Sequence, residues 1–256
     1  MVTVNHVKIG YEEKVIVPDI SLSIKEGEMV TILGPNGSGK STVLKAVCRL
    51  LKHQAGEIML QHKPIGGMSN KEIAQVLSVL AQVNTSPEDM TVKRLVEFGR
   101  LPHRSWYEPL SEKDRKVVEW AITETRLKGY EERRVTDLSG GERQRAWIAM
   151  CLAQQPKILF LDEPTTYLDI SHQYEVMNLL ERLNKELGMT IVMVLHDLNQ
   201  AIRYSDTVFV MKQGKLIGAG APEAVLTKEL IKEVYTLEVS VLPNMNGGCP
   251  LVVPCC

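Results

Sequence analysis

Apolar and polar residues alternate near the N-terminus of the chain, and this period of two predicts strands. Residues 2–9 and 15–24 both alternate in this way, which indicates two half-buried strands. Pro18 interrupts the second pattern and favours an edge position, because proline cannot donate to a strand ladder. The turns between these strands are short, which predicts antiparallel pairing. An apolar run at 29–33 predicts a further strand.

Helical spacing replaces this alternation in the middle of the chain. After a buried strand predicted at 76–81, strand-like runs become few. Residues 91–100 carry apolar positions at helical spacing, and Ser111 begins a predicted capping box that opens a long helix at 112–125. We therefore interpret 83–155 as a helical subdomain inserted into an α/β core.

Continuous apolar runs return after this region. Residues 158–161 and 191–195 predict central parallel strands, which are buried on both faces. A helix is predicted between them at 170–187, and Gly188 is a suitable C-cap. Residues from 243 onwards are rich in proline, glycine and cysteine, and predict a loosely held tail.

Composition limits the classes of protein that the chain could be. It has 256 residues with 44% apolar content, and a formal net charge of −1 from 30 basic and 31 acidic residues. This balance gives no electrostatic footprint for nucleic acid. The longest apolar runs have the length of strands, and residues 1–10 lack the apolar centre of a signal peptide. We therefore expect a protein that is made and kept in the cytoplasm.

The five cysteines favour reduced thiols over a disulfide framework, because their number is odd in a large charged chain. Cys48 and Cys151 lie in helical apolar patterns and are predicted to be small core residues. Cys249, Cys255 and Cys256 crowd the C-terminus. A metal site among them is the less favoured alternative to a thiol-bearing tail, because no histidine is near them in sequence.

The most informative stretch is 29–42, MVTILGPNGSGKST, where a strand, a glycine-rich loop and a helix follow one another. Four residues separate Gly34 from Gly39-Lys40-Ser41, which is the spacing of a phosphate-binding loop. Such a loop forms an anion nest at the helix N-terminus, and the lysine adds a charge for the β- and γ-phosphates. The serine hydroxyl suits Mg²⁺, which prefers oxygen. The residues predicted to bind the nucleotide here are Gly34, Pro35, Asn36, Gly37, Ser38, Gly39, Lys40, Ser41 and Thr42.

Two acids follow the predicted strand at 158–161. Asp162 falls at its carboxyl end, where open α/β sheets bind ligands, and could hold magnesium directly or through water. Glu163 comes next and is placed to orient or deprotonate an attacking water. The alternative, a strand that ends in two surface acids, loses weight because a phosphate-binding loop lies upstream.

A second glycine nest precedes the helix predicted at 143–154. It consists of Ser139, Gly140, Gly141 and Glu142 after Leu138, and it also suits phosphate. One nucleotide does not need two such nests from one chain, but two facing chains could use both. The alternative is an ordinary helix start with Ser139 as its N-cap.

In this order the motifs resemble those of ABC-type ATPases, because LSGGE is similar to the LSGGQ signature of that family. The resemblance implies that Gln82 is the glutamine of the Q-loop, Asp169 the aspartate of the D-loop and His196 the switch histidine. Tyr11 stands where the family has its adenine-stacking aromatic residue. Glu163, His196 and Gln82 are then the expected catalytic residues.

The same resemblance implies the cofactors, the partners and the fold. ATP and Mg²⁺ are expected, with Ser41, Gln82 and Asp162 near the metal. Two chains are expected to sandwich two ATPs, so that each signature, Ser139–Glu142, acts on the partner chain's ATP. The implied fold is α/β, a P-loop NTPase core with a mixed sheet, an antiparallel N-terminal β subdomain and an inserted α-helical subdomain. The whole chain forms one ABC ATPase domain, with a core at 1–82 and 156–242, the helical subdomain at 83–155 and a tail at 243–256.

Two positions depart from the family pattern. Glu142 replaces the commonest glutamine, but Ser139–Gly141 are intact and function is expected to survive. Tyr167 stands where alanine is commoner, before Leu168-Asp169, and could alter contacts across the dimer.

A finer resemblance points to the ATPases of iron-siderophore, haem and vitamin B12 importers. It rests on the segments 99–103, GRLPH, 111–115, SEKDR, and 165–173, TTYLDISHQ. We therefore expect an ATP-hydrolysing subunit at the cytoplasmic face of the membrane, which powers import through a separate permease and depends indirectly on a substrate-binding protein. The alternatives are a soluble non-transport ABC ATPase that acts on ribosomes or DNA, and a small-molecule phosphotransferase. The first of these usually has two ATPase domains or a coiled-coil insertion, and the second has no use for LSGGE.

Overall fold

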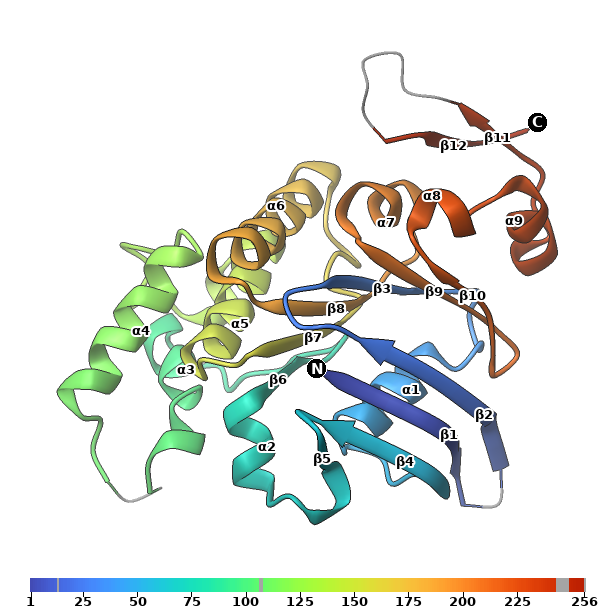
Figure 1. Cartoon of the computed structure of the whole chain (residues 1–256). Helices are drawn as coiled ribbons and strands as arrows, with labels where there is room; N and C mark the ends of the chain where they lie inside the picture. Colours follow the sequence, from blue (N-terminus) through green and yellow to red (C-terminus); the bar gives the residue numbers. More distant parts are fainter. Residues whose placement is uncertain (13, 106–107, 243–248, 256) are drawn as a thin grey trace. The chain divides into compact units, whose positions relative to one another are not determined.

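The structure is a computed structural model that describes residues 1–256 except 13, 106–107, 243–248 and 256 (Figure 1). By its internal contacts the chain separates into two compact units. The first comprises Met1–Gly67 and Thr190–Cys256, and the second comprises Met68–Met189. The predicted subdomain boundaries at 83 and 155 differ from this division and stay a prediction.

The first unit begins with an antiparallel sheet, as the alternating pattern predicts. Its strands are β1 (Val2–Tyr11), β2 (Lys14–Ile24), β4 (Ala55–Leu60) and β5 (Lys63–Pro64), in the order β2-β1-β4-β5 (Figure 1). Pro18 lies in β2, an edge strand of this sheet, and is not among the residues that pair with β1.

A second sheet in this unit contains the strands with continuous apolar runs. β3 (Met29–Leu33) pairs in parallel with β8 (Thr190–Val194) and with β9 (Thr207–Lys212), and β10 (Lys215–Gly220) pairs antiparallel with β9. Every residue of β3 and β8 is buried. This mixture of parallel and antiparallel pairs confirms the predicted mixed sheet. The helices of this unit are α1 (Lys40–Val47), α7 (Leu198–Tyr204), α8 (Pro222–Val225) and α9 (Lys228–Tyr235).

Part of the C-terminal segment is ordered by pairing. β12 (Leu251–Pro254) lies antiparallel to β11 (Val239–Leu242), and the Asn199 side chain of α7 holds β12 from its other side. Asn199 Nδ2 donates to the Val252 carbonyl at 3.1 Å, and its Oδ1 accepts from the Val252 N–H at 2.8 Å. The tail predicted to be loosely held is therefore tied down at 251–254, because an amide 53 residues away in sequence satisfies its backbone.

The second unit combines helices with one pair of parallel strands. β6 (Leu77–Leu80) pairs with β7 (Ile158–Asp162). The helices are α2 (Asn70–Val76), α3 (Val92–Phe98), α4 (Glu112–Glu124), α5 (Gly140–Ala153) and α6 (Ile170–Leu187). The predicted capping box of Ser111 is confirmed at the start of α4, and Gly188 ends α6 in the left-handed conformation with φ 63°.

Both helical cysteines are buried, as predicted. Burial raises the pKa of the Cys151 thiol to about 11, so that it stays protonated and packs as a small apolar group. Cys249 is partly exposed and Cys255 is exposed, whereas Cys256 lies outside the described residues.

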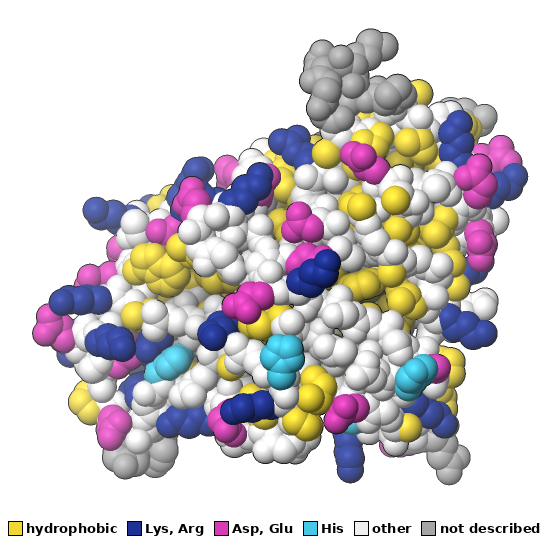
Figure 2. All heavy atoms as spheres, in the orientation of Figure 1, with side chains coloured by type: hydrophobic (Ala, Val, Ile, Leu, Met, Phe, Trp, Pro, Cys, Tyr) yellow, Lys and Arg dark blue, Asp and Glu magenta, His cyan; other side chains and the backbone are white. Residues whose placement is uncertain are grey.

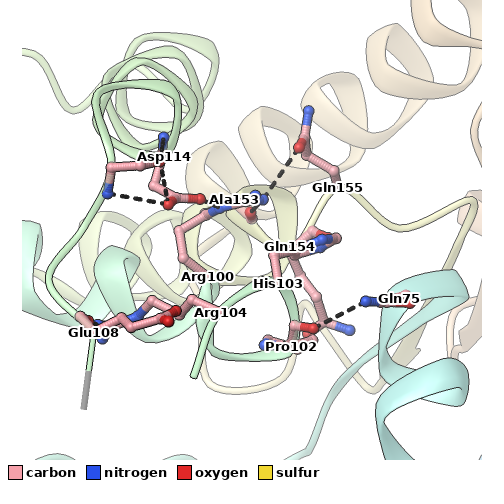
Figure 3. Close-up of polar contacts among 11 residues, drawn as sticks. Gln75, Arg100, Pro102, His103, Arg104, Glu108, Asp114, Ala153, Gln154 and Gln155 are labelled. Atoms are coloured by element: carbon pink, nitrogen blue, oxygen red, sulfur yellow. Dashed lines mark hydrogen bonds and ion pairs between the residues drawn. The ribbon is translucent and has the colours of Figure 1, made fainter. Parts of the chain in front are cut away.

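The segment at 99–103 anchors the end of α5 (Figure 3). Arg100 is buried, and its Nε donates to Asp114 Oδ1 at 2.8 Å. The same guanidinium donates to the Ala153 carbonyl at 2.6 Å, at the C-terminal end of α5, where a cation is favourable. His103 Nε2 lies 2.7 Å from the Gln154 carbonyl oxygen. This motif therefore joins the start of α4 to the end of α5.

Charged side chains of both signs are interspersed on the face drawn in Figure 2. This distribution agrees with the near-zero formal net charge of −1.

Candidate functional site

The loop between β3 and α1 has the geometry that its glycines predict. Gly34 has φ 146°, and a Cβ at this position would lie 2.1 Å from the Met211 carbonyl oxygen of β9. Gly37 and Gly39 have φ of 76° and 100°, in the region that side chains disfavour. Gly39 is the N-cap of α1 and makes no side-chain cap hydrogen bond. The first N–H groups of α1 are therefore not capped by a side chain at this position, which suits an anion.

Lys40 folds back over this loop. It is only 6% exposed, and its Nζ donates to the carbonyl oxygens of Gly34 at 2.8 Å and Pro35 at 3.1 Å. An ammonium group at the positive end of a helix is unfavourable unless an anion lies nearby. Ser38 Oγ is also buried and has no hydrogen-bond partner among the described atoms. An orphaned hydroxyl, a lysine and a helix N-terminus together fit a polyphosphate.

The hairpin of β9 and β10 supports the same loop. The sequence did not predict this support. The Gly214 N–H donates to the Ser38 carbonyl at 3.0 Å, and Met211 contacts the loop at Gly34. These residues follow the loop by more than 170 positions, and nothing in the local pattern connects them to it.

Two other predicted residues of the first unit are accessible. Tyr11 ends β1, is 45% exposed, and lines a hollow of about 600 Å³ together with 51–54. Its ring can therefore meet a planar group from solution. His196 follows β8 at an exposed position, immediately before Asp197, which caps α7. Their contacts with adenine and with the γ-phosphate remain predictions.

In the second unit, β7 ends in the two predicted acids. Asp162 is the last residue of β7 and is buried, and Glu163 turns into the left-handed conformation with φ 55°. The structure brings Gln82 to this point, because its Nε2 donates to Glu163 Oε2 at 2.7 Å. Thr166 Oγ1 donates to the same oxygen at 3.0 Å. Two donors therefore hold the Glu163 carboxylate in one orientation.

The signature segment forms a capped helix start. Ser139 Oγ accepts from the Glu142 N–H at 3.3 Å, and a Glu142 carboxylate oxygen accepts from the Ser139 N–H at 2.8 Å. The hydrogen bond from the Ser139 backbone is the main cause that lowers the pKa of Glu142. Glutamic acid therefore replaces glutamine without loss of the cap. The Ser139 hydroxyl also donates to the Glu142 carboxylate, which is the second cause of the lowered pKa.

Asp169 caps α6 and lies close to the signature in the same unit. Its Oδ1 accepts from the His172 N–H at 2.9 Å, from His172 Nδ1 at 2.8 Å and from Ser171 Oγ at 2.9 Å. These hydrogen bonds lower the pKa of Asp169 to about 2, and the one from the His172 backbone N–H has the largest effect. Beside it, Tyr167 is 90% exposed and has φ 65°. The unusual tyrosine thus presents its ring to solvent in the isolated chain.

Comparison with known proteins decides the family. Residues 17–166 match the ABC transporter family. The chain belongs to this family. It is 51% identical over 241 residues to the petrobactin import ATP-binding protein FpuC of Bacillus anthracis, covering 94% of this chain and 89% of that protein. It is 45% identical over 243 residues to the iron(3+)-hydroxamate import ATP-binding protein FhuC of Bacillus subtilis (strain 168), covering 95% and 90%.

A solved structure agrees with this result. The dimeric ATP-binding cassette MJ0796, in a post-hydrolysis state bound to ADP and Pi, superimposes with a TM-score of 0.75 at 31% identity, covering 87% of this chain and 99% of that one. The P-loop NTPase fold predicted from the sequence is therefore confirmed. ATP-binding subunits of ABC transporters are ATPases coupled to transport, and they work as dimers with membrane permeases. Among the described residues, no helix combines the length and apolar character that crossing a bilayer needs.

Proposed function

We propose that this chain hydrolyses ATP to power the import of a ferric siderophore through a separate membrane permease, from the cytoplasmic face. The observation that carries the enzymatic part is the carboxylate of Glu163, held by Gln82 and Thr166 directly after the buried Asp162. The cargo is inferred from relatives such as FpuC and FhuC, whose names specify petrobactin and iron(3+)-hydroxamate import. Haem and cobalamin are the alternative cargoes.

Each site residue has a proposed role toward ATP. Lys40 and the N–H groups of 34–42 bind the β- and γ-phosphates, and Tyr11 stacks on adenine. Glu163 accepts the proton of the attacking water, and His196 contacts the γ-phosphate. Ser41, Asp162 and Gln82 offer the oxygen ligands that Mg²⁺ prefers, and the ion would neutralise charge on the phosphates.

Gln82 is the proposed link to transport. Its amide bonds Glu163 in this structure, and we propose that it exchanges this contact for the metal or the attacking water when ATP binds. Val83, the next residue, is 73% exposed and begins the segment proposed to receive a cytoplasmic helix of the permease. ATP would thereby bias the position of this segment through its differential contacts.

Transport measurements test this proposal. The chain is co-expressed with its permease and reconstituted in vesicles with the binding protein. These vesicles should take up ferric catecholate or ferric hydroxamate only when ATP is present. Cysteines at Val83 and in the cytoplasmic loops of the permease should crosslink. Uptake of haem or cobalamin instead would reassign the cargo. An active ATPase that never co-purifies with a permease would contradict the transport role.

The two nests are proposed to serve one ATP from opposite chains. Ser139, Gly140 and Gly141 of one chain would contact the ATP held by Lys40 of the other, in agreement with the dimeric state of MJ0796. A symmetric dimer of this kind contains two composite sites.

Mixing two inactive variants tests the shared site. Ser139→Ala and Lys40→Ala homodimers each carry a defect in both sites, whereas the mixed dimer has one site with both defects and one with none. A one-to-one mixture should therefore recover about a quarter of the wild-type ATPase rate if a single intact site turns over. Heterodimers are verified with two different affinity tags. Verified heterodimers without recovery would contradict the shared site.

A further inference from the structure

We propose that His172 is a positioning residue that fixes the signature glycine Gly141 against the D-loop aspartate Asp169 within each chain. This inference rests on the proposed function, in which both segments face the ATP held by the partner chain. All of the contacts that support it lie within the second unit.

The Asp169 carboxylate fixes one edge of the His172 ring. His172 Nδ1 lies 2.8 Å from Asp169 Oδ1, and a carboxylate at neutral pH only accepts, so Nδ1 carries the hydrogen. The His172 backbone N–H also donates to this oxygen, at 2.9 Å. Because the side chain and backbone of one residue converge on one atom, the imidazole has little freedom to rotate.

The side chain of His172 fills the space beside Gly141. A Cβ added at Gly141 would lie 2.2 Å from His172 Cδ2 and 2.6 Å from its Cγ, distances that real Cβ atoms do not show. Leu168 makes a looser contact at Gly140, where a Cβ would lie 3.4 Å from its Cδ2. Gly141 has no positive φ, so its lack of a side chain is explained by the close approach of the ring.

Through the His172 side chain, the N-terminus of α5 packs against the D-loop at Asp169. α5 begins at Gly140, and its first N–H groups are the proposed donors to the partner's ATP. A shift of about 1 Å in such donors can lower a rate by roughly a hundredfold. His172 would therefore control the position of the signature N–H groups without contacting ATP.

Three substitutions at His172 separate its two contacts. His172→Asn keeps a donor near the position of Nδ1 but removes the ring, His172→Phe keeps a ring but removes the donor, and His172→Ala removes both. The backbone N–H that caps α6 is present in every variant. We expect kcat for ATP to fall about tenfold in His172→Ala and less in the other two. ATP affinity of the single chain should not change, because the loop of Lys40 belongs to the other unit.

A double substitution provides the decisive test. Gly141→Ala alone should lower kcat about a hundredfold, because its methyl group collides with the ring. Gly141→Ala with His172→Ala should be no worse than His172→Ala alone, since the methyl group then occupies vacated space. Multiplied losses in the double variant, or full kcat in His172→Ala, would overturn the proposal. Thermal unfolding and ATP affinity confirm that each variant is folded.

The wild-type protein distinguishes this failure from failure of the proposed function. Wild-type chain that neither hydrolyses ATP nor dimerises with it would contradict the function itself. If the wild type is active but the losses of kcat from Gly141→Ala and His172→Ala multiply in the double variant, only the role of His172 is contradicted.

Discussion

Lys40→Ala abolishes tight ATP binding, with an expected increase of at least about a hundredfold in Kd, because charge-assisted hydrogen bonds each contribute roughly 1.5–3 kcal/mol. Lys40 is the only charged residue in 34–42. Its Nζ already lies over the loop, 2.8 Å from the Gly34 carbonyl oxygen, so it is positioned before the nucleotide arrives. Fluorescence titration with ATP measures the change.

Lys45→Ala is the matched control for this prediction. Lys45 lies on the same helix, α1, but is exposed and outside the loop. Its removal changes the net charge by the same amount and should leave Kd within about twofold, since an exposed charge is screened by solvent. Equal affinity of Lys40→Ala and wild type would remove the loop from the nucleotide site.

Local parts of the site follow from the sequence because neighbours in the chain determine them. The spacing from Gly34 to Ser41 imposes a tight loop between a strand and a helix, and the structure has this loop. The caps at Ser111 and Gly188 have the same local origin, since each satisfies backbone groups within one helical turn.

Contacts between distant residues could not be predicted from a single sequence. The bond from Gln82 to Glu163 joins residues 81 positions apart, and the support of the loop by Met211 depends on how β9 pairs with β3. The family resemblance placed Gln82 near the chemistry but not against Glu163. The hold of Asn199 on β12 likewise depends on folding of the whole unit, and the composition of the tail predicts the opposite.

The sequence predicts two roles for Ser139, an N-cap of α5 and a ligand of the partner's ATP. An N-cap and a ligand of ATP are alternatives only if the hydroxyl makes a single bond. In the structure its oxygen accepts from the Glu142 N–H and its hydrogen is donated to the Glu142 carboxylate, so a phosphate oxygen would replace that carboxylate as the acceptor. The cap therefore orients the group that is proposed to bind the partner's ATP.

Glu163→Gln should retain ATP binding and lower kcat by about 10²–10⁴-fold, the usual contribution of a general base. A glutamine carbonyl oxygen can still accept from Gln82 Nε2 and Thr166 Oγ1, so the ground-state geometry of the site is kept. What is lost is the capacity to take the proton of the attacking water. Since ATP then persists, the variant should accumulate as an ATP-bound dimer, which size-exclusion chromatography with ATP detects.

Two further variants identify the cause of this effect. Glu119→Gln, on the exposed side of α4, makes the same chemical change away from the site and should hydrolyse ATP at the wild-type rate. Thr166→Val keeps the base but removes one of its two donors, and should give an intermediate rate because the carboxylate is less well oriented. Hydrolysis at the wild-type rate by Glu163→Gln would exclude Glu163 as the base. A dimer that forms equally without ATP would show that association does not depend on trapped nucleotide.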